Sequence, residues 1–164
     1  MRLFVAVRPP DEVLDAVAEL ARPERPGVRW TGRDQWHVTL RFLGEVADPE
    51  PVVAAIDEAV LEGGEAVVGP RVAALGPRIV CLPVAGLDEL ARGVIAATRK
   101  LGDPPGNRQF RGHLTLARVR QGRANALAGA AFDARFDVAD VRLIRSHLGP
   151  DGARYEDLYV RSLA

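Results

Sequence analysis

The chain has 164 residues, of which 48% are hydrophobic and 27% are charged. This composition is typical of a folded globular protein and argues against disorder, and we expect a single domain over residues 1–164. The formal net charge is zero, so no overall field favours duplex DNA or a membrane surface. The lone cysteine, Cys81, excludes a disulfide framework and is interpreted as an inert core thiol in a reducing, cytoplasmic setting.

The first half of the chain alternates between strand and helix patterns. Residues 3–7 predict a buried strand, which is too short for a signal peptide or a membrane span. A helix is expected from residue 10 to about 20, where apolar residues recur at helical spacing after two acids. A strand fragment at 28–30 and a strand at 36–43 follow, and a helix at 50–62 ends at paired glycines.

The second half predicts a hairpin, a helix, a strand, a short helix and a closing pair of strands. These elements are expected at residues 66–75 and 78–84, 87–101, 113–119, 124–130, 138–148 and 155–160. Because turns of hairpin length join several strands, some pairs must be antiparallel. The order of elements favours an α+β chain of two similar lobes.

A four-residue pattern occurs twice. His37-Val-Thr39-Leu and His113-Leu-Thr115-Leu lie 76 residues apart in a chain with three histidines. Alternation along a strand puts the imidazole and the hydroxyl on one face and the apolar residues on the other. Histidine exchanges protons near neutral pH, and a threonine hydroxyl can donate a hydrogen bond to an anionic oxygen. The repeat therefore predicts two histidines that face each other across a cleft.

The charge is unevenly distributed along the chain. Residues 99–123 contain seven bases and one acid, Asp103, so the second motif lies in a basic segment. Such a segment favours an anionic substrate, although a set of solvated arginines is the alternative. Strict alternation places Arg41 on the face of His37 but Arg118 on the face opposite His113, so Arg118 reaches the cleft only if the strand is bulged there.

Other candidate residues have simpler interpretations. His147 lacks the Thr-Leu context and is expected to be an ordinary strand residue, while Trp36 and Phe42 are expected to pack in the core rather than stack on a base. Two histidines without a carboxylate or thiol at ligand spacing fall short of a zinc site. We therefore expect neither a metal nor a cofactor.

The paired motifs resemble those of the 2H phosphoesterase superfamily, and in particular its bacterial and archaeal RNA 2′,3′-cyclic phosphodiesterases, historically called 2′-5′ RNA ligases. The resemblance covers the whole chain in order. It is carried by residues 1–7, 36–46, 110–118 and 143–158. One departure is Gly112, since the family usually has proline before the second histidine, and glycine leaves the start of that strand less fixed.

The resemblance implies two pseudo-symmetric lobes, each an antiparallel sheet with helices on its outer face, with the motif strands lining a central cleft. It implies metal-independent hydrolysis of a terminal 2′,3′-cyclic phosphate in RNA, or of a small cyclic nucleotide, to a 2′-phosphate. Nothing in the sequence indicates more than a monomer. By the family's pattern His37 is the proton donor and His113 the proton acceptor, although the sequence itself leaves the two roles interchangeable.

The remaining substrate contacts follow from the same reading. Thr39 and Thr115 would hold the non-bridging phosphate oxygens. The resemblance adds Arg118 as a phosphate contact, and Arg41 is a further candidate. Two alternatives stay open: ligation of a 2′,3′-cyclic phosphate end to a 5′-hydroxyl end, and a non-catalytic module that binds RNA ends or nucleotides.

Overall fold

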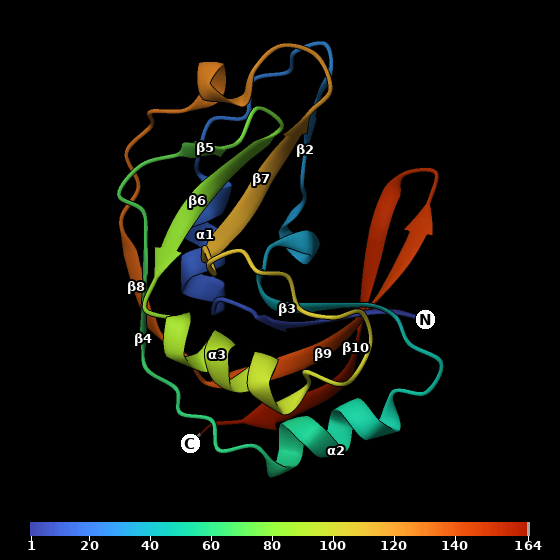
Figure 1. Cartoon of the computed structure of the whole chain (residues 1–164). Coiled ribbons are helices and arrows are strands. Elements are labelled where there is room, and N and C mark those ends of the chain that lie inside the picture. The colour runs from blue at the N-terminus through green and yellow to red at the C-terminus, as the bar shows by residue number, and fades with distance from the viewer. Residues whose placement is uncertain (164) are drawn as a thin grey trace.

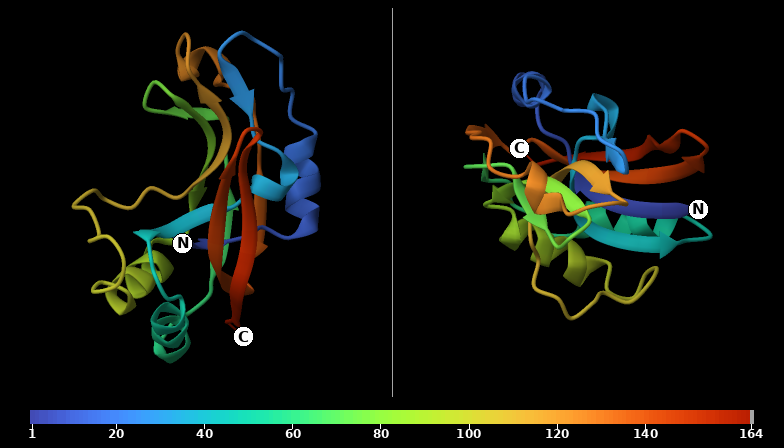
Figure 2. Two further views of the ribbon diagram at one scale, coloured as in Figure 1. Left: turned by 90° about the vertical axis from the view of Figure 1, so that its right-hand side faces the viewer. Right: turned by 90° about the horizontal axis from the view of Figure 1, so that it is seen from above.

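The computed structural model describes residues 1–163, which form one strongly curved antiparallel sheet with three α-helices (Figures 1 and 2). The α-helices are α1 (Asp11–Ala18), α2 (Glu50–Glu58) and α3 (Asp88–Ala97). The strands are β1 (Arg2–Val7), β2 (Val28–Trp30), β3 (Val38–Glu45), β4 (Glu65–Val68), β5 (Ala73–Leu75), β6 (Ile79–Ala85), β7 (His113–Val119), β8 (Ala134–Asp137), β9 (Asp140–Gly149) and β10 (Gly152–Ser162). Short 3-10 helices cover Arg33–Gln35 and Ala124–Leu127. The predicted α+β class is confirmed.

The sheet has a narrow joint at its centre. Its strand order is β10-β9-β1-β3-β7-β6-β4-β8, with β2 added to β7 and β5 added to β6. The two motif strands, β3 and β7, meet at one paired position, Val38 opposite Leu114. Four strands of the main path lie on each side of this joint, so we refer to the β3 half and the β7 half.

Neither half of the sheet is a continuous half of the chain. The β3 half takes β1 and β3 from the N-terminus and β9 and β10 from the C-terminus, whereas the short strand β2 crosses over to pair with β7. The helices also cross between the two halves. α1 follows β1 of the β3 half but packs against β8 of the β7 half, whereas α3 follows β6 of the β7 half but packs on β3, with α2 beside it. Figure 1 shows α2 and α3 together below the sheet and α1 apart from them.

A common core holds the two halves together. Val38 and Leu114 at the joint are both fully buried, and so are Leu3, Leu82 and Leu143 from the neighbouring strands. These residues belong to one hydrophobic cluster that includes the buried faces of all three helices. Burial of this apolar surface is the main stabilising contribution, at roughly 25 cal/mol per Å². No helix within residues 1–163 is both long enough and apolar enough to cross a membrane.

Three elements differ from the sequence-based expectation. The strand expected at 66–75 is two strands, because β4 pairs with β8 and the end of β6, whereas β5 pairs with the start of β6. The helix expected at 124–130 is a single 3-10 turn. Strand β8 was not predicted, since its four residues are too few to display a period.

Candidate active site

The two motifs lie side by side at the joint of the sheet. Because Val38 pairs with Leu114 in an antiparallel register, one step along each strand brings His37 opposite Thr115 and Thr39 opposite His113. All four side chains line one cleft with a volume of about 470 Å³. The two motifs thus contribute to the lining of the same cleft.

Each motif strand carries a β-bulge at the same place. Along β3, Ala6 pairs with Thr39 and Val5 with Arg41, so Leu40 is the extra residue. Along β7, the partners of Cys81 and Val80 are likewise two residues apart, so Leu116 is the extra residue. A bulge shifts the alternation of faces by one residue. After each bulge, the side chains that strict alternation assigns to the core point into the cleft. The side chains that it assigns to the cleft point into the core.

The bulge in β3 contradicts the assignment of Arg41 to the substrate. Arg41 is 5% exposed and lies on the core side of the strand. Its guanidinium donates hydrogen bonds to the backbone carbonyls of Phe42, Thr98, Leu101 and Asp103, at 2.7, 3.3, 2.9 and 2.8 Å. These carbonyls include groups that the end of α3 leaves without a helical partner. Arg41 is therefore a structural residue that ties α3 to β3.

The bulge in β7 has the opposite consequence for Arg118, which is exposed and lines the cleft. Arg29 on β2 pairs directly with Arg118 and also lines the cleft, as does Arg2 on β1. Among residues 1–163, none of these three arginines forms an ion pair with an acid, and no acid lines the cleft. Like charges directly opposed on a sheet repel each other, so a bound anion would relieve this arrangement.

The cleft lies between β3, β7 and the tip of the β9–β10 hairpin. Its lining comprises Arg2, Phe4, Arg29, Trp30, Thr31, Gln35, His37, Thr39, Phe42, His113, Thr115, Arg118, Ser146, Leu148, Gly152, Ala153 and Tyr155. Figure 1 shows β7 and the hairpin both rising above β3, with β7 to the left and the hairpin to the right. Gly152 at the turn leaves room for Arg29, because a Cβ there would lie 2.3 Å from its guanidinium.

Both imidazoles are oriented in the same way by the backbone. Nδ1 of His37 donates to the carbonyl of Gln35, and Nδ1 of His113 donates to the carbonyl of Arg111, each at 2.7 Å. In each case the acceptor lies two residues before the histidine. This bond fixes the proton on Nδ1, so Nε2 is left for chemistry in the cleft. Nε2 of His37 lies 3.0 Å from the hydroxyl of Thr39.

The surroundings of the two histidines differ. The ring of His37 packs against Phe4, with centroids 4.8 Å apart, and meets the ring of Tyr155 edge-on at 5.2 Å. Burial lowers the pKa of His37 to about 4, and the bond to the Gln35 carbonyl opposes this effect. Nearby positive charges, including His113, lower the pKa of His37 further. His37 is therefore neutral near pH 7 in the free protein.

Other expectations can be compared with the structure. Trp36 is buried in the core, as predicted. The prediction for Phe42 is wrong: its ring is 45% exposed and lines the cleft, because the bulge turns it there, and the guanidinium of Arg2 lies 4.9 Å above it. His147 is a strand residue whose Nε2 lies 2.9 Å from a carboxylate oxygen of Glu156. At Gly112, a Cβ would lie 2.3 Å from the carbonyl of Val84, so glycine permits a close approach of two strands there.

Sequence reasoning missed several residues of the cleft. Arg2 lies two residues before Phe4 on β1, a spacing that could have placed both side chains on one face of the strand, although the five buried residues of β1 show no alternation. Arg29 and Tyr155 had no such signal, since they come from short or distant segments that only the folded sheet brings to the motifs. Of the bases in the segment 99–123, Arg118 lines the cleft and Arg111 lines an adjoining pocket.

Comparison with known proteins gives a consistent result. Residues 6–64 match the family model described as LigT like Phosphoesterase. The chain is 31% identical to an RNA 2′,3′-cyclic phosphodiesterase of Archaeoglobus fulgidus, over 98% of this chain and 99% of that protein. The crystal structure of TT0787 of Thermus thermophilus has a TM-score of 0.83 and 32% identity, covering 99% of this chain and 98% of that one.

A further solved structure extends the comparison to a ligand complex. The crystal structure of E. coli LigT complexed with 3′-AMP has a TM-score of 0.79 and 25% identity, and the match covers 99% of this chain and 97% of that one. Near-complete coverage in both directions means that the similarity extends beyond the first motif to the whole sheet. The chain therefore belongs to the LigT-like phosphoesterases of the 2H superfamily, the family that includes the RNA 2′,3′-cyclic phosphodiesterases.

Proposed function

We propose that the protein hydrolyses the terminal 2′,3′-cyclic phosphodiester of RNA to a 2′-phosphomonoester without a metal. The observation that carries this proposal is the pair of histidines in one cleft, each held through Nδ1 and flanked by a threonine hydroxyl and unpaired arginines. The names of its relatives support the substrate class, since one is called an RNA 2′,3′-cyclic phosphodiesterase and another was crystallised with 3′-AMP.

The reaction needs one proton acceptor and one proton donor. A water oxygen attacks phosphorus while its proton passes to one imidazole. The bond from phosphorus to the 3′ oxygen breaks, and the other imidazole protonates that oxygen, leaving the phosphate on the 2′ oxygen. Two histidines suffice if one enters the reaction neutral and the other protonated. Thr39 and Thr115 would donate to the non-bridging oxygens, and Arg118 would offset the charge that grows on them.

The burial of His37 bears on which histidine plays which role. The family's pattern makes His37 the donor and His113 the acceptor. A histidine whose pKa is lowered to about 4 is neutral over most of the working range, which is the form that accepts a proton. His37 can donate to the leaving oxygen only if the bound phosphate raises its pKa, as a nearby anion does, and we retain the family's assignment with His113 taking the proton from water.

The proposal of metal independence rests on the available donors. Within residues 1–163, no three His, Cys, Asp or Glu side chains lie close enough together to hold an ion. Imidazole, hydroxyl and guanidinium groups supply the proton transfers and charge stabilisation that a metal would otherwise provide. Turnover should therefore be the same in excess EDTA as after addition of Mg²⁺, Mn²⁺ or Zn²⁺.

The direct test is phosphorus NMR of an oligonucleotide with a 2′,3′-cyclic phosphate end, incubated with the protein in EDTA. We expect the cyclic signal to be replaced by that of a 2′-phosphomonoester. His37→Ala and His113→Ala should each lower kcat by at least about 100-fold, the usual scale of acid–base catalysis. His147→Ala is the matched control and should leave kcat unchanged. A double histidine variant with full activity would overturn the mechanism.

The same experiment separates the two alternatives. If the protein only binds RNA ends, the cyclic signal persists at all times and the histidine variants change binding modestly. If it is chiefly a ligase, adding an oligonucleotide with a 5′-hydroxyl end should yield a longer product with a 2′-5′ linkage, because that hydroxyl then replaces water as the nucleophile. Hydrolysis and ligation share the transition state at phosphorus, so both would require the two histidines.

A further inference from the structure

The two halves of the cleft are not equally filled. On the β3 half, Phe4 and Tyr155 pack with Ala6 and Ile144 into a small cluster separate from the main core. This cluster lies on the cleft face and covers the ring of His37 through two aromatic contacts. Imidazole and phenyl rings in such contact gain from both apolar burial and ring geometry. His37 is therefore held by side chains of the protein itself.

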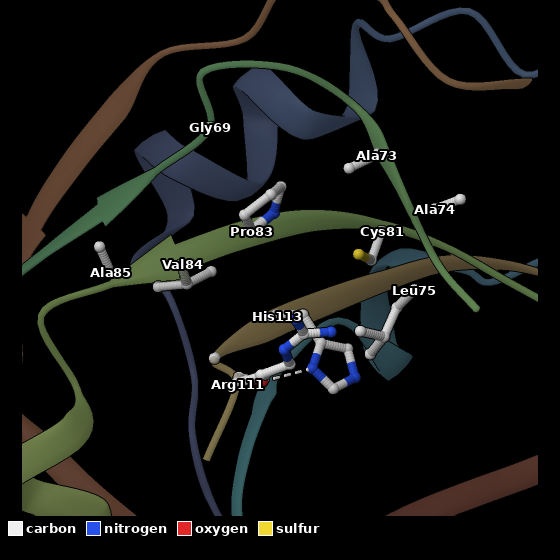
Figure 3. A pocket seen from close by; sticks show the side chains of 11 residues that line it. Gly69, Ala73, Ala74, Leu75, Cys81, Pro83, Val84, Ala85, Arg111 and His113 are labelled. Atoms are coloured by element: carbon white, nitrogen blue, oxygen red, sulfur yellow. Dashed lines mark hydrogen bonds between the residues drawn. The ribbon is translucent and has the colours of Figure 1, made fainter. Parts of the chain in front are cut away.

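The corresponding place on the β7 half contains a cavity. Register puts Pro83 beside His113, Cys81 beside Thr115, and Ala73 beside Cys81, so these side chains share the cleft face. They line a pocket of about 320 Å³ that also includes Leu75, Arg111 and His113. No Phe, Tyr or Trp is among its lining residues (Figure 3). We call this space the Cys81 pocket.

The Cys81 pocket adjoins the catalytic cleft, because His113 lines both. Its volume lies at the lower end of the range for small-molecule sites, and such sites are mostly apolar with few polar groups. Here the polar side chains are Arg111 and His113, together with the buried thiol of Cys81. A flat group with apolar faces fits this lining better than a sugar or a phosphate does.

We propose that the Cys81 pocket binds the terminal nucleobase of the cyclic phosphate substrate, an inference that rests on the proposed function. A phosphate held between the two histidines lies one ribose away from that base, and the pocket opens directly beside one of them. The base then covers His113 on one side, as Phe4 and Tyr155 cover His37. Because few polar groups line the pocket, all four bases should be accepted.

The ring of Phe42 is the most exposed of the aromatic rings that line the cleft, so it is another surface on which a base could stack. Arg2 already lies over this ring at 4.9 Å, and a guanidinium in that position competes with a base for the ring face. The Cys81 pocket has no such occupant among the described residues. Phe42→Ala should therefore have a smaller effect on nucleotide binding than filling the Cys81 pocket.

A comparison of two substrates tests the proposal. Ala73→Phe places a ring in the pocket from the short strand β5, and Ala54→Phe on the exposed face of α2 is the matched control. We expect Ala73→Phe to raise KM for adenosine 2′,3′-cyclic phosphate at least about tenfold. The same change should leave kcat/KM for the base-free methyl riboside 2′,3′-cyclic phosphate within about twofold. Equal effects on both substrates, or no effect on either, would overturn the proposal.

A second measurement does not depend on turnover. Cys81 is the only cysteine in the sequence, so its modification by methyl methanethiosulfonate can be followed by mass spectrometry of the intact protein. Burial raises the pKa of the Cys81 thiol to about 11, so the reaction is best run at alkaline pH. Adenosine 2′-monophosphate at saturation should slow this modification at least about fivefold, whereas ribose 5-phosphate should not.

The two measurements distinguish failure of this proposal from failure of the proposed function. If the protein turns over neither cyclic phosphate, the proposed function is wrong, and protection of Cys81 by the nucleotide still decides whether the pocket binds a base. If turnover is normal but Cys81 is modified at the same rate with and without the nucleotide, the pocket proposal is wrong and the function stands.

Discussion

Replacing Tyr155 by alanine removes one of the two rings that cover His37, and it should raise the pKa of that histidine. Burial is the largest cause of the lowering from 6.5 to about 4. This difference of about 2.5 pH units corresponds to roughly 3 kcal/mol at 1.36 kcal/mol per unit. Phe4 remains in contact in the variant, so we expect about half of the difference to be recovered, a rise of about 1 pH unit.

The measurement is a titration of the imidazole signals by NMR. The chain has three histidines, so His113→Gln and His147→Gln assign the remaining signal to His37. Tyr155→Phe keeps the ring and is the matched control, and it should leave the pKa of His37 within about 0.3 pH units of wild type. The reasoning is refuted if His37 titrates near 6.5 in the wild type, or if Tyr155→Ala and Tyr155→Phe have equal pKa values.

The same lowering predicts how stability depends on pH. In the unfolded chain His37 takes up a proton near pH 6.5, whereas in the folded protein it stays neutral down to about pH 4. The unfolded state thus binds more protons between these values, and the contribution of His37 to stability is lost as pH falls through this window. Urea unfolding should show that wild type loses roughly 3 kcal/mol more than His37→Gln between pH 7 and pH 4. Equal losses would contradict the buried neutral state.

Three further changes separate roles within the site. Arg118→Ala should lower kcat/KM about 100-fold, as loss of a transition-state donor does, with the free energy of unfolding changed by less than about 0.5 kcal/mol; a loss of stability instead would make Arg118 a structural residue. Arg41→Leu should lower the free energy of unfolding in urea by about 3 kcal/mol, because buried carbonyls lose their donor. Its kcat/KM at 25 °C should stay within about threefold of wild type. A stable but inactive variant would show that Arg41 acts on the substrate instead. A substrate with sulfur in place of the 3′ oxygen needs no proton on its leaving group, so it should restore turnover to His37→Ala and not to His113→Ala; rescue of His113→Ala instead would support the opposite assignment.

The two motifs could be recognised in the sequence because their information is local. The pattern of His37 with Thr39, and of His113 with Thr115, requires only that a strand alternates, and the first residues of each strand do so. The α+β class likewise followed from the order of short periodic segments. Sheet order could not be predicted in the same way, because β1 is joined to β9 by contacts between residues more than 130 positions apart.

The strand faces assigned to Arg41 and Arg118 depend on the β-bulges, which a run of apolar residues does not reveal. Leu40 and Leu116 are expected to be buried whether the strand is regular or bulged, so nothing in their chemistry marks them as bulge residues. Each bulge reverses the parity of the residues that follow. It thus removes Arg41 from the cleft and brings Arg118 into it. The same burial pattern in both strands shows that the bulge is part of the repeat itself.

The charge around the cleft was predicted in sign but not in origin. The basic segment at 99–123 contributes Arg118 to the cleft, whereas Arg2 and Arg29 come from strands outside it. Charged residues that are close in sequence create a strong local electrostatic field only if the fold brings their side chains together. A loop such as residues 98–112 instead spreads its side chains apart. Arg2 and Phe4 lie two residues apart on β1 and both line the cleft, so the spacing along a strand, rather than the run of charge, accounts for the position of Arg2.

The two motifs are nearly symmetric about the joint, so only the residues that differ between the two sides can give the histidines different roles. Each histidine donates from Nδ1 to the carbonyl two residues before it, has a threonine two residues after it and is followed by a bulge, so none of these shared features can give the two histidines different roles. The aromatic cover on His37 and the open pocket beside His113 are what distinguish them. Since an acid–base pair works only if its two members differ in protonation, these two features are the ones that can set that difference.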